Sequence, residues 1–358
     1  VHAFYYLWYG VPAVDGKWLH WDHKVLPHWD RARRRRRPRR AATAPRRFYP
    51  ALGPYSSRSA DTLDTHFAQM AAAGIDAAVL SWTGRPDAAA VSDTQGVVTD
   101  NAVAAAAAAA RAHGVGAAIH LEPYEGRHPT SVRRDLEYLV GAYGDALHRM
   151  PRRPCGDEPA LPVVYVYDAY HNTKEDWAEL LCPGGARSIR GTAHDVVAIA
   201  TLLDARERAL VDEGCFDGFY TYFATEGFTF GSTARNWAQL ATWARERNLH
   251  FSPSVGPGYN DTRVRPWNRA ATRDRADGRY YAKMLRSAAT SGADMISITS
   301  FNEWGEGTQI EPAARPERGA GTPAVDSHLA YEYPDMYLDI TRKVVARFKH
   351  TRPPEAEL

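Results

Sequence analysis

The chain has 358 residues, of which 44% are hydrophobic and 24% are charged, and its formal net charge is +2. This composition is ordinary for a globular protein with a sizeable core, and the absence of a run of about 18 apolar residues excludes a membrane-spanning segment. The three cysteines are too sparse, and odd in number, for a disulfide scaffold. A bridge between Cys155 and Cys182, which both lie in predicted loops, stays open as an alternative.

The first predicted strand covers residues 1–9, which are apolar and aromatic and are followed by Gly10 and Pro12. A long loop rich in Trp and His comes next. Its histidines form no H-x-H or H-E-x-x-H pattern on a regular element, so hydrogen bonding is favoured over metal binding. No metal site is therefore expected.

A low-complexity run of arginines, Arg31 to Arg40, continues this loop. Such a run is found in patches that bind nucleic acids or other polyanions, and also in insertions within surface loops. Because no basic helix or base-stacking motif accompanies the run, we interpret residues 31–47 as a loop insertion and expect no nucleic-acid partner.

Beyond residue 59 helical and strand patterns alternate regularly. Further strands are predicted at 77–82, 116–120, 161–167, 196–203, 216–223, 250–255 and 295–301, and helices at 62–73, 100–113, 131–148, 174–181, 205–213, 234–247, 278–291 and 331–349. Alternating βα units indicate a parallel sheet, and eight of them indicate a closed (β/α)8 TIM barrel. We expect one α/β domain over 1–350, long loops at the C-terminal ends of the strands, and a tail at 351–358.

The loop after the last predicted strand contains Asn302, Glu303, Trp304 and Glu306. Two like charges this close together disfavour double ionisation, so the pKa of one carboxyl should be raised. Acid/base chemistry on a sugar requires such a pair. A solvated acidic loop is the alternative interpretation of these two residues alone.

The other strand ends are also rich in carboxylates and aromatic rings. Barrel active sites lie at this end of the strands. Carboxylates and rings suit a neutral, polyhydroxylated ligand that becomes cationic in its transition state, and they do not suit a phosphate. No G-x-S-x-G elbow or G-x-G-x-x-G run is present, so no cofactor is expected. The residues concerned are Trp8, Tyr9, Trp82, Glu122, Tyr124, Asp168, Tyr220, Tyr222 and Tyr259.

Over nearly its whole length the chain resembles the endo-α-1,2-mannosidases of glycoside hydrolase family 99. The matching stretches occur in the same order along the chain. They are Phe4-Tyr-Tyr, Trp8-Tyr-Gly10, Phe48-Tyr-Pro, Pro54-Tyr-Ser-Ser-Arg58, Leu80-Ser-Trp82, His120, Glu122-Pro-Tyr124, Tyr165-Val-Tyr-Asp168, Phe216-Asp-Gly218, Tyr220-Thr-Tyr-Phe-Ala224, Pro253-Ser-Val-Gly-Pro-Gly-Tyr259, Arg265-Pro-Trp-Asn268 and Ser297 to Glu311.

The resemblance implies a retaining, endo-acting enzyme that cleaves internal α-1,2-mannosidic linkages of glucosylated high-mannose N-glycans. It implies no protein nucleophile. Glu303 would deprotonate the 2-hydroxyl of the sugar, which attacks C1 and forms a 1,2-anhydro intermediate. Glu306 would protonate the leaving oxygen and later deprotonate water. Two nearby carboxylates by themselves would instead have suggested a nucleophile with an acid/base.

The resemblance also implies a further carboxylate at the reacting sugar, which matches Glu122, and no metal or cofactor. The complete set of expected substrate-binding residues is Glu122, Tyr6, His120, Tyr222, Trp82, Tyr124, Asn302 and Trp304. Two positions depart from the family: Gly305 stands where a histidine is usual, and Thr83 where an aromatic residue faces the outermost sugar.

The expected partner is therefore a mannose-containing oligosaccharide or N-glycoprotein, bound by a monomer without membrane contact. The expected location is the Golgi lumen for a eukaryotic chain, and the periplasm or the exterior for a bacterial one. The alternative function is a catalytically weak or silent carbohydrate-binding barrel. A silent barrel would have lost a carboxylate, whereas Glu303 and Glu306 are both present.

Overall fold

A computed structural model describes residues 1–21, 49–86, 93, 95–154, 159–314 and 331–350. The arginine run, Cys155 and the predicted tail at 351–358 lie outside these residues. The described elements begin at His2 and end at His350.

The described residues form a parallel barrel. Its strands are β1 (His2–Tyr5), β3 (Ala77–Trp82), β4 (Gly116–Leu121), β6 (Leu161–Val166), β7 (Val197–Thr201), β8 (Gly218–Tyr220), β9 (His250–Ser252), β10 (Ser254–Val255) and β11 (Ser297–Ile298). Neighbours pair in this order from β1 to β9, while β11 pairs with both β10 and β1. Only Pro253 separates β9 from β10, and proline has no N–H to donate to a ladder. The two strands therefore share one barrel position, and the predicted (β/α)8 barrel is confirmed.

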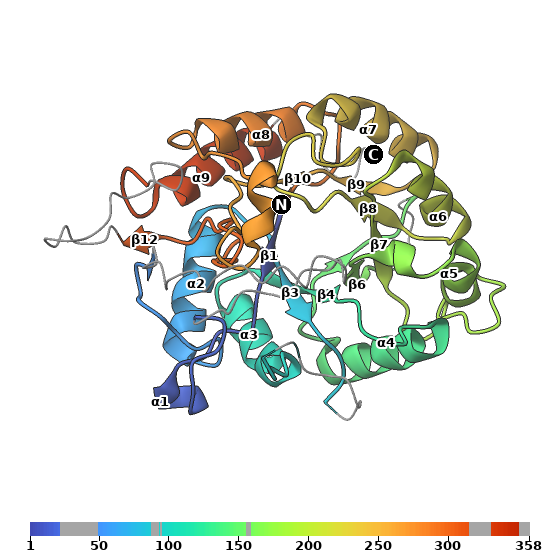
Figure 1. Cartoon of the computed structure of the whole chain (residues 1–358). Helices are drawn as coiled ribbons and strands as arrows, with labels where there is room; N and C mark the ends of the chain where they lie inside the picture. The colour runs from blue at the N-terminus through green and yellow to red at the C-terminus, as the bar shows by residue number, and fades with distance from the viewer. Residues whose placement is uncertain (22–48, 87–92, 94, 155–158, 315–330, 351–358) are drawn as a thin grey trace, which may run out of the picture.

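Helices surround the barrel as a ring (Figure 1). Each barrel position is followed by one of them along the chain. They are α2 (Ala60–Ala72), α3 (Asp100–Ala112), α4 (Pro129–Tyr143), α5 (Lys174–Leu181), α6 (Arg208–Glu213), α7 (Trp237–Glu246), α8 (Arg279–Ala289) and α9 (Met336–His350). Smaller elements are α1 (Pro12–Asp15), η2 (Ala169–His171), η3 (Ala205–Glu207), η4 (Ala234–Asn236), η5 (Pro266–Ala271) and the strands β2 (Tyr49–Pro50), β5 (Arg149–Met150) and β12 (Ala313–Ala314).

Successive residues of a barrel strand face opposite sides of the wall. In β1, Phe4 packs inside the barrel and Tyr5 packs outside against the helices. In β3, Val79 likewise packs inside and Leu80 outside. Both faces are covered, so these strands carry apolar residues on both faces instead of alternating with polar ones. The inner core is aromatic near its centre, where the Phe4 and Tyr220 rings lie 5.4 Å apart.

Two observed strands, β1 and β11, are shorter than predicted where they meet the loop at 299–312, which is predicted to carry the catalytic glutamates and is called here the catalytic loop. β1 ends at Tyr5, since the next N–H, that of Tyr6, donates to the side chain of Asn302 at 2.7 Å. β11 covers only Ser297–Ile298, because Ser300 N donates within its own loop to Thr308 O at 2.9 Å. Both differences arise from loop contacts that hydrophobic patterning does not encode.

A disulfide joins Cys182, at the end of α5, to Cys215, which follows α6. The Cα atoms are 5.1 Å apart, within the range that a bridge requires. The alternative pairing of Cys182 with Cys155 is therefore wrong. The barrel places the ends of adjacent helices together although 33 residues separate the two cysteines.

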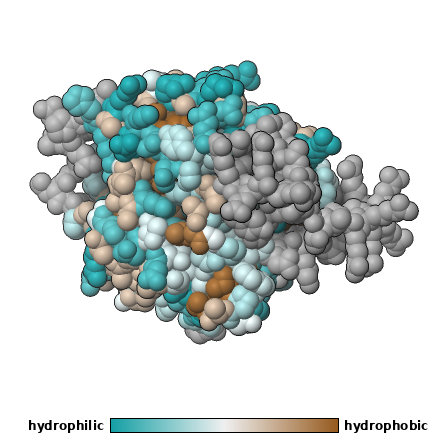
Figure 2. Space-filling model, turned by 90° about the vertical axis from the view of Figure 1, so that its left-hand side faces the viewer, coloured by the Kyte–Doolittle hydropathy of each residue, from teal (hydrophilic) through white to brown (hydrophobic). Residues whose placement is uncertain are grey.

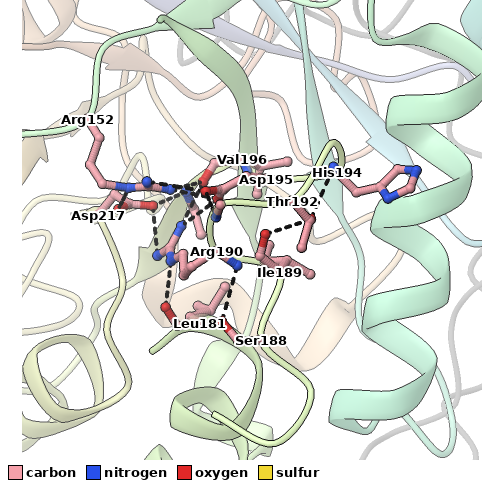
Figure 3. A network of polar contacts seen from close by, with 12 residues as sticks. Arg152, Leu181, Ser188, Ile189, Arg190, Thr192, His194, Asp195, Val196 and Asp217 are labelled. Atoms are coloured by element: carbon pink, nitrogen blue, oxygen red, sulfur yellow. Dashed lines mark hydrogen bonds and ion pairs between the residues drawn. The ribbon is translucent and has the colours of Figure 1, made fainter. Parts of the chain in front are cut away.

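Four charged side chains form a network at the N-terminal ends of β7 and β8, called here the basal network: Arg152, Arg190, Asp195 and Asp217 (Figure 3). Asp195 accepts from Arg152 at 2.7 Å and pairs with Arg190 at 3.2 Å. Asp217 pairs with the same two arginines at 2.7 and 3.1 Å. Burial favours a raised pKa for Asp195, but hydrogen bonds from Arg152 and a backbone N–H outweigh it and lower the pKa.

The face of the molecule drawn in Figure 2 is largely hydrophilic, and its hydrophobic residues form small, separate spots among the coloured atoms. No helix within the described ranges has the length and apolar character needed to cross a membrane.

Candidate active site

The candidate site lies at the C-terminal end of the barrel, in the loop that follows β11. Glu303 is 5% exposed. Its backbone N–H donates to Ser300 Oγ at 2.8 Å, and its Oε1 accepts the N–H groups of Gly305 at 2.7 Å and Glu306 at 3.2 Å. The loop thus curls around this carboxyl group and holds it in one orientation.

The pKa of Glu303 is raised to about 8. Burial is the largest cause and the negative charge of Glu306 is the second, while the two backbone N–H groups lower it only in part. At neutral pH Glu303 therefore retains its proton when the site is empty. The predicted raised pKa within the pair is found here.

Glu306 has a different environment, because Arg265 Nη1 donates to its Oε1 at 2.9 Å. Its side chain is 24% exposed. Burial raises the pKa of Glu306, and Arg265 offsets this effect only in part, so the pKa of Glu306 stays above its ordinary value. The same guanidinium nitrogen also contacts Asp261 at 3.1 Å, so one arginine joins two carboxylates.

Glu122 follows β4 and lies on the inner side of the barrel wall. Its Oε1 accepts from Ser81 at 2.8 Å and lies 3.0 Å from His120 Nδ1. The other ring nitrogen of His120 is 2.7 Å from the hydroxyl of Tyr220. His120 and Glu122 are two residues apart, so strand alternation turns both towards the mouth.

Tyr6 and Tyr222 meet across the site, with their hydroxyl groups 2.5 Å apart. Burial first, and then carboxylates including Glu122 and Glu306, raise the pKa of Tyr6 far above its ordinary value; for Tyr222, burial and then Tyr6 raise it. Both phenols are therefore neutral hydrogen-bond donors. His120 stacks on the Tyr222 ring with 5.8 Å between centroids.

Asn302 is fully buried and holds the catalytic loop to β1. Its side chain accepts from Tyr6 N at 2.7 Å and donates to Tyr6 O at 3.0 Å, which imitates a strand ladder. Its backbone carbonyl accepts from Tyr9 at 2.8 Å. Asn302 therefore orients the loop, and its predicted contact with a ligand stays a prediction.

Trp304 is held by a second buried carboxylate, that of Glu311. The indole N–H donates to Glu311 Oε2 at 2.7 Å, and Tyr55 donates to the same oxygen at 2.8 Å. His66 Nε2 lies 3.0 Å from the other oxygen. The Trp304 ring is partly exposed beside Glu303, so it can cover one face of a bound sugar.

Two of the predicted substrate-binding residues lie away from this cluster. Trp82 is fully buried on the outer side of the barrel wall, where its indole N–H donates to Asp100 of α3 at 2.7 Å. The hydroxyl group of Tyr124 donates to Asp135 and Ser131 of α4. The odd-even alternation of β3 turns Ser81 inward and Trp82 outward. The contact of Trp82 with substrate stays a prediction.

Arg265 and Asp261 were not assigned a role from the sequence, although Arg265 begins one of the matching stretches. Both belong to the segment after β10, between Tyr259 and η5. The ion pair of Arg265 with Glu306 joins residues 41 positions apart in the sequence, so no local spacing could have indicated it. Asp261 reaches Glu306 only through Arg265. Glu311 was missed for the same reason.

Gly305 and Thr83, the two positions that depart from the family, each donate a backbone hydrogen bond near the site. Gly305 supplies the N–H that Glu303 Oε1 accepts at 2.7 Å. Thr83 N donates to Thr99 Oγ1 at 3.0 Å. Among the residues that the structure describes, no group of three or more His, Cys, Asp or Glu side chains is arranged to hold a metal ion.

A TIM barrel with two carboxylates on one loop and aromatic rings at the C-terminal ends of its strands is typical of the class of barrel glycosidases. Comparison with known proteins agrees. Residues 1–350 match the model of Glycosyl hydrolase family 99. The chain belongs to this family.

Similar proteins include the glycoprotein endo-alpha-1,2-mannosidase of Rattus norvegicus, 42% identical over 98% of this chain and 75% of the rat protein. A glycoprotein endo-alpha-1,2-mannosidase-like protein of Danio rerio is 42% identical over 97% of this chain and 78% of its own length. A solved family 99 endo-alpha-mannosidase of Bacteroides thetaiotaomicron superposes with a TM-score of 0.83 at 36% identity, covering 99% of this chain and 98% of that chain.

Proposed function

We propose that the protein is a retaining endo-α-1,2-mannosidase that cleaves internal linkages of high-mannose N-glycans, glucosylated ones included. The observation that carries the proposal is the pair Glu303 and Glu306, held on one loop at the barrel mouth in two different environments. The name of the rat relative, a glycoprotein endo-alpha-1,2-mannosidase, supports the choice of linkage. The name of the Bacteroides relative, an endo-alpha-mannosidase, supports internal cleavage of α-mannosides.

In the first step, the Glu303 carboxylate takes the proton of the sugar 2-hydroxyl, and that oxygen forms a bond to C1. The bond from C1 to the leaving oxygen breaks, and the Glu306 carboxylic acid protonates the leaving oxygen. The product is a 1,2-anhydro sugar. Tyr6 and Tyr222 are neutral donors beside the reacting ring and can orient its hydroxyl groups.

In the second step, the Glu306 carboxylate takes a proton from water, whose oxygen bonds to C1 from the face that the leaving group occupied. The bond from C1 to O2 opens, and O2 takes the proton back from Glu303. Two inversions at C1 give net retention. Glu122, which is 17% exposed, is placed to accept a hydrogen bond from the same sugar.

A disulfide between Cys182 and Cys215 supports work in an oxidising compartment, which is the Golgi lumen for a eukaryotic source and the periplasm or exterior for a bacterial one. We propose a monomer that acts on glycans free or attached to protein.

Digestion of a glucosylated and a non-glucosylated high-mannose glycan, followed by mass spectrometry, tests the proposal. We expect an oligosaccharide fragment from an internal α-1,2 cut in at least one digest, and NMR should show the α-anomer first. Release of single sugars from the chain end, or the β-anomer as first product, contradicts it. Binding of both glycans without cleavage would identify a silent carbohydrate-binding barrel.

A further inference from the structure

The two glutamates differ in one charged contact. Arg265 Nη1 donates to Glu306 Oε1 at 2.9 Å. Glu303, in the part of the chain that the structure describes, has backbone N–H groups on its Oε1 and no cation within ion-pairing distance. The difference is unexpected for carboxylates three residues apart, because a mobile arginine could in principle serve either of them.

Arg265 is itself held in place. Asp261, which is fully buried, accepts from Arg265 Nη1 at 3.1 Å and from Asn268 Nδ2 at 2.9 Å. The backbone N–H of Arg265 also donates to Asp261 O at 2.7 Å. The Arg265 side chain is 32% exposed and that of Glu306 is 24% exposed, so their contact lies where an entering ligand can reach it.

This arrangement determines where a single proton lies in the empty site. Arg265 favours the ionised form of Glu306, while burial without a cation favours the neutral form of Glu303. The pKa of Glu303, raised to about 8, agrees with this location. The proposed chemistry begins with the opposite arrangement, an ionised Glu303 and a protonated Glu306. A single proton shared by the pair therefore lies on Glu303, whereas the proposed chemistry needs it on Glu306.

We propose that Arg265 controls which glutamate carries the proton, and that entry of substrate frees Glu306 from Arg265 so that the proton moves from Glu303 to Glu306. This inference rests on the proposed function. An O–H bond breaks at Glu303 and one forms at Glu306, so the proton count and the net charge of the pair do not change. Arg265 is a positioning residue, because it acts on the sugar only through Glu306.

Other groups also act on the two carboxyl groups, and the experiment has to separate Arg265 from them. Their charges or hydroxyl groups face the pair from the loops after β1, β4, β6, β8 and β10. They are Tyr6, Tyr9, Glu122, Tyr167, Tyr222, Tyr259 and Asp261. Within this set, Asp261 is the residue that forms an ion pair with Arg265.

Carbon-13 NMR of protein labelled at the glutamate Cδ atoms measures the two titrations directly, with Glu303→Gln and Glu306→Gln proteins for assignment. In the wild type Glu303 should titrate above Glu306. Arg265→Gln should raise the titration midpoint of Glu306 by about one pH unit or more. The control is Arg269→Gln, which removes an exposed arginine of η5 and should leave both midpoints unchanged. An unchanged Glu306 midpoint in Arg265→Gln overturns the proposal.

The pH profile of kcat/KM is the second readout. Arg265→Gln should move the acidic limb upward by a similar amount, Arg265→Lys should keep it near the wild-type position, and Asp261→Asn should move it downward. If Arg265→Gln loses turnover equally at all pH values, Arg265 only supports the structure of the loop, and the proposal is contradicted. If the wild type cleaves no α-1,2-mannoside, the proposed function fails, while the NMR titration still decides the role of Arg265.

Discussion

The two ends of the barrel bury carboxylates to the same extent and treat them in opposite ways. Asp195 of the basal network and Glu303 of the catalytic loop are both 5% exposed. Asp195 contacts two arginines, and its pKa is lowered. Glu303 accepts backbone N–H groups and, among the described residues, no arginine or lysine, and it lies beside a second carboxylate. Its pKa is raised to about 8. Burial alone therefore does not decide ionisation; the partners do.

The difference separates what the fold requires from what catalysis requires. A buried charge that is paired and hydrogen-bonded can hold the ends of neighbouring strands together. The basal network does so at the N-terminal ends of β7 and β8 (Figure 3). A carboxyl group that has to exchange its proton near neutral pH cannot have such partners. The buried carboxyl group at the C-terminal end of the barrel therefore stabilises the fold less at neutral pH than those of the basal network at the N-terminal end.

The largest expected effect is on turnover. Glu303→Gln and Glu306→Gln should each lower kcat/KM on an α-1,2-mannoside by about 10³-fold or more, because an amide can neither accept nor return the proton. Calorimetry should show that the oligosaccharide still binds. The catalytic assignment is contradicted if either variant, with an unchanged circular dichroism spectrum, turns over substrate like the wild type.

The next effect is on stability at the basal end. Asp195→Ala leaves Arg152 and Arg190 short of a partner and should lower the free energy of unfolding by about 3 kcal/mol. Urea unfolding measures this, and kcat below the melting temperature should be unaffected. The matched control is Asp212→Ala, whose ion pair with Arg247 is 45% and 41% exposed and should be worth about 0.5 kcal/mol or less. Equal losses in the two variants would contradict the comparison.

The two ends should also respond to pH with opposite signs. Glu303 has a raised pKa, so its contribution to stability is complete below about pH 4.5 and is lost as the pH rises towards about 8. Asp195 has a lowered pKa, so its contribution is present above about pH 4 and is lost on acidification. Glu303→Gln should therefore unfold like the wild type at pH 4 and be about 5 kcal/mol more stable at pH 9. A difference that does not change with pH would disprove this assignment.

The smallest expected effect concerns Glu311, a buried carboxylate at the catalytic end that is held by Tyr55, His66 and Trp304. Glu311→Gln weakens a charged hydrogen bond to the Trp304 indole and should lower kcat/KM by about tenfold. Tryptophan fluorescence reports the displaced ring. Unchanged kinetics together with a shifted spectrum would show that Trp304 does not contribute to sugar binding.

Most of the architecture could be predicted because it follows from local pattern. The apolar runs and helical periods reproduced every barrel position, and the strand at 77–82 was predicted with its observed bounds. The side chains of Glu303, Glu306, Glu122, His120, Tyr6 and Tyr222 meet at the predicted end of the barrel. These positions follow from the rule that strand ends form the mouth.

Trp82 shows where pattern reasoning ends. Its strand is buried on both faces, so the sequence carries no contrast between inward and outward residues. The partner of Cys182 and the exact ends of β1 and β11 depend likewise on segments that are distant along the chain.

The sequence by itself determined the number and order of the βα units and the presence of two carboxylates after the last strand, since hydrophobic period and motif order are local properties. Only the tertiary structure decided that Glu306 contacts Arg265 while Glu303 accepts backbone N–H groups and pairs with no cation among the described residues. The reason is physical: ionisation depends on charges and burial within a few ångströms, and those neighbours come from loops after different strands of a closed barrel.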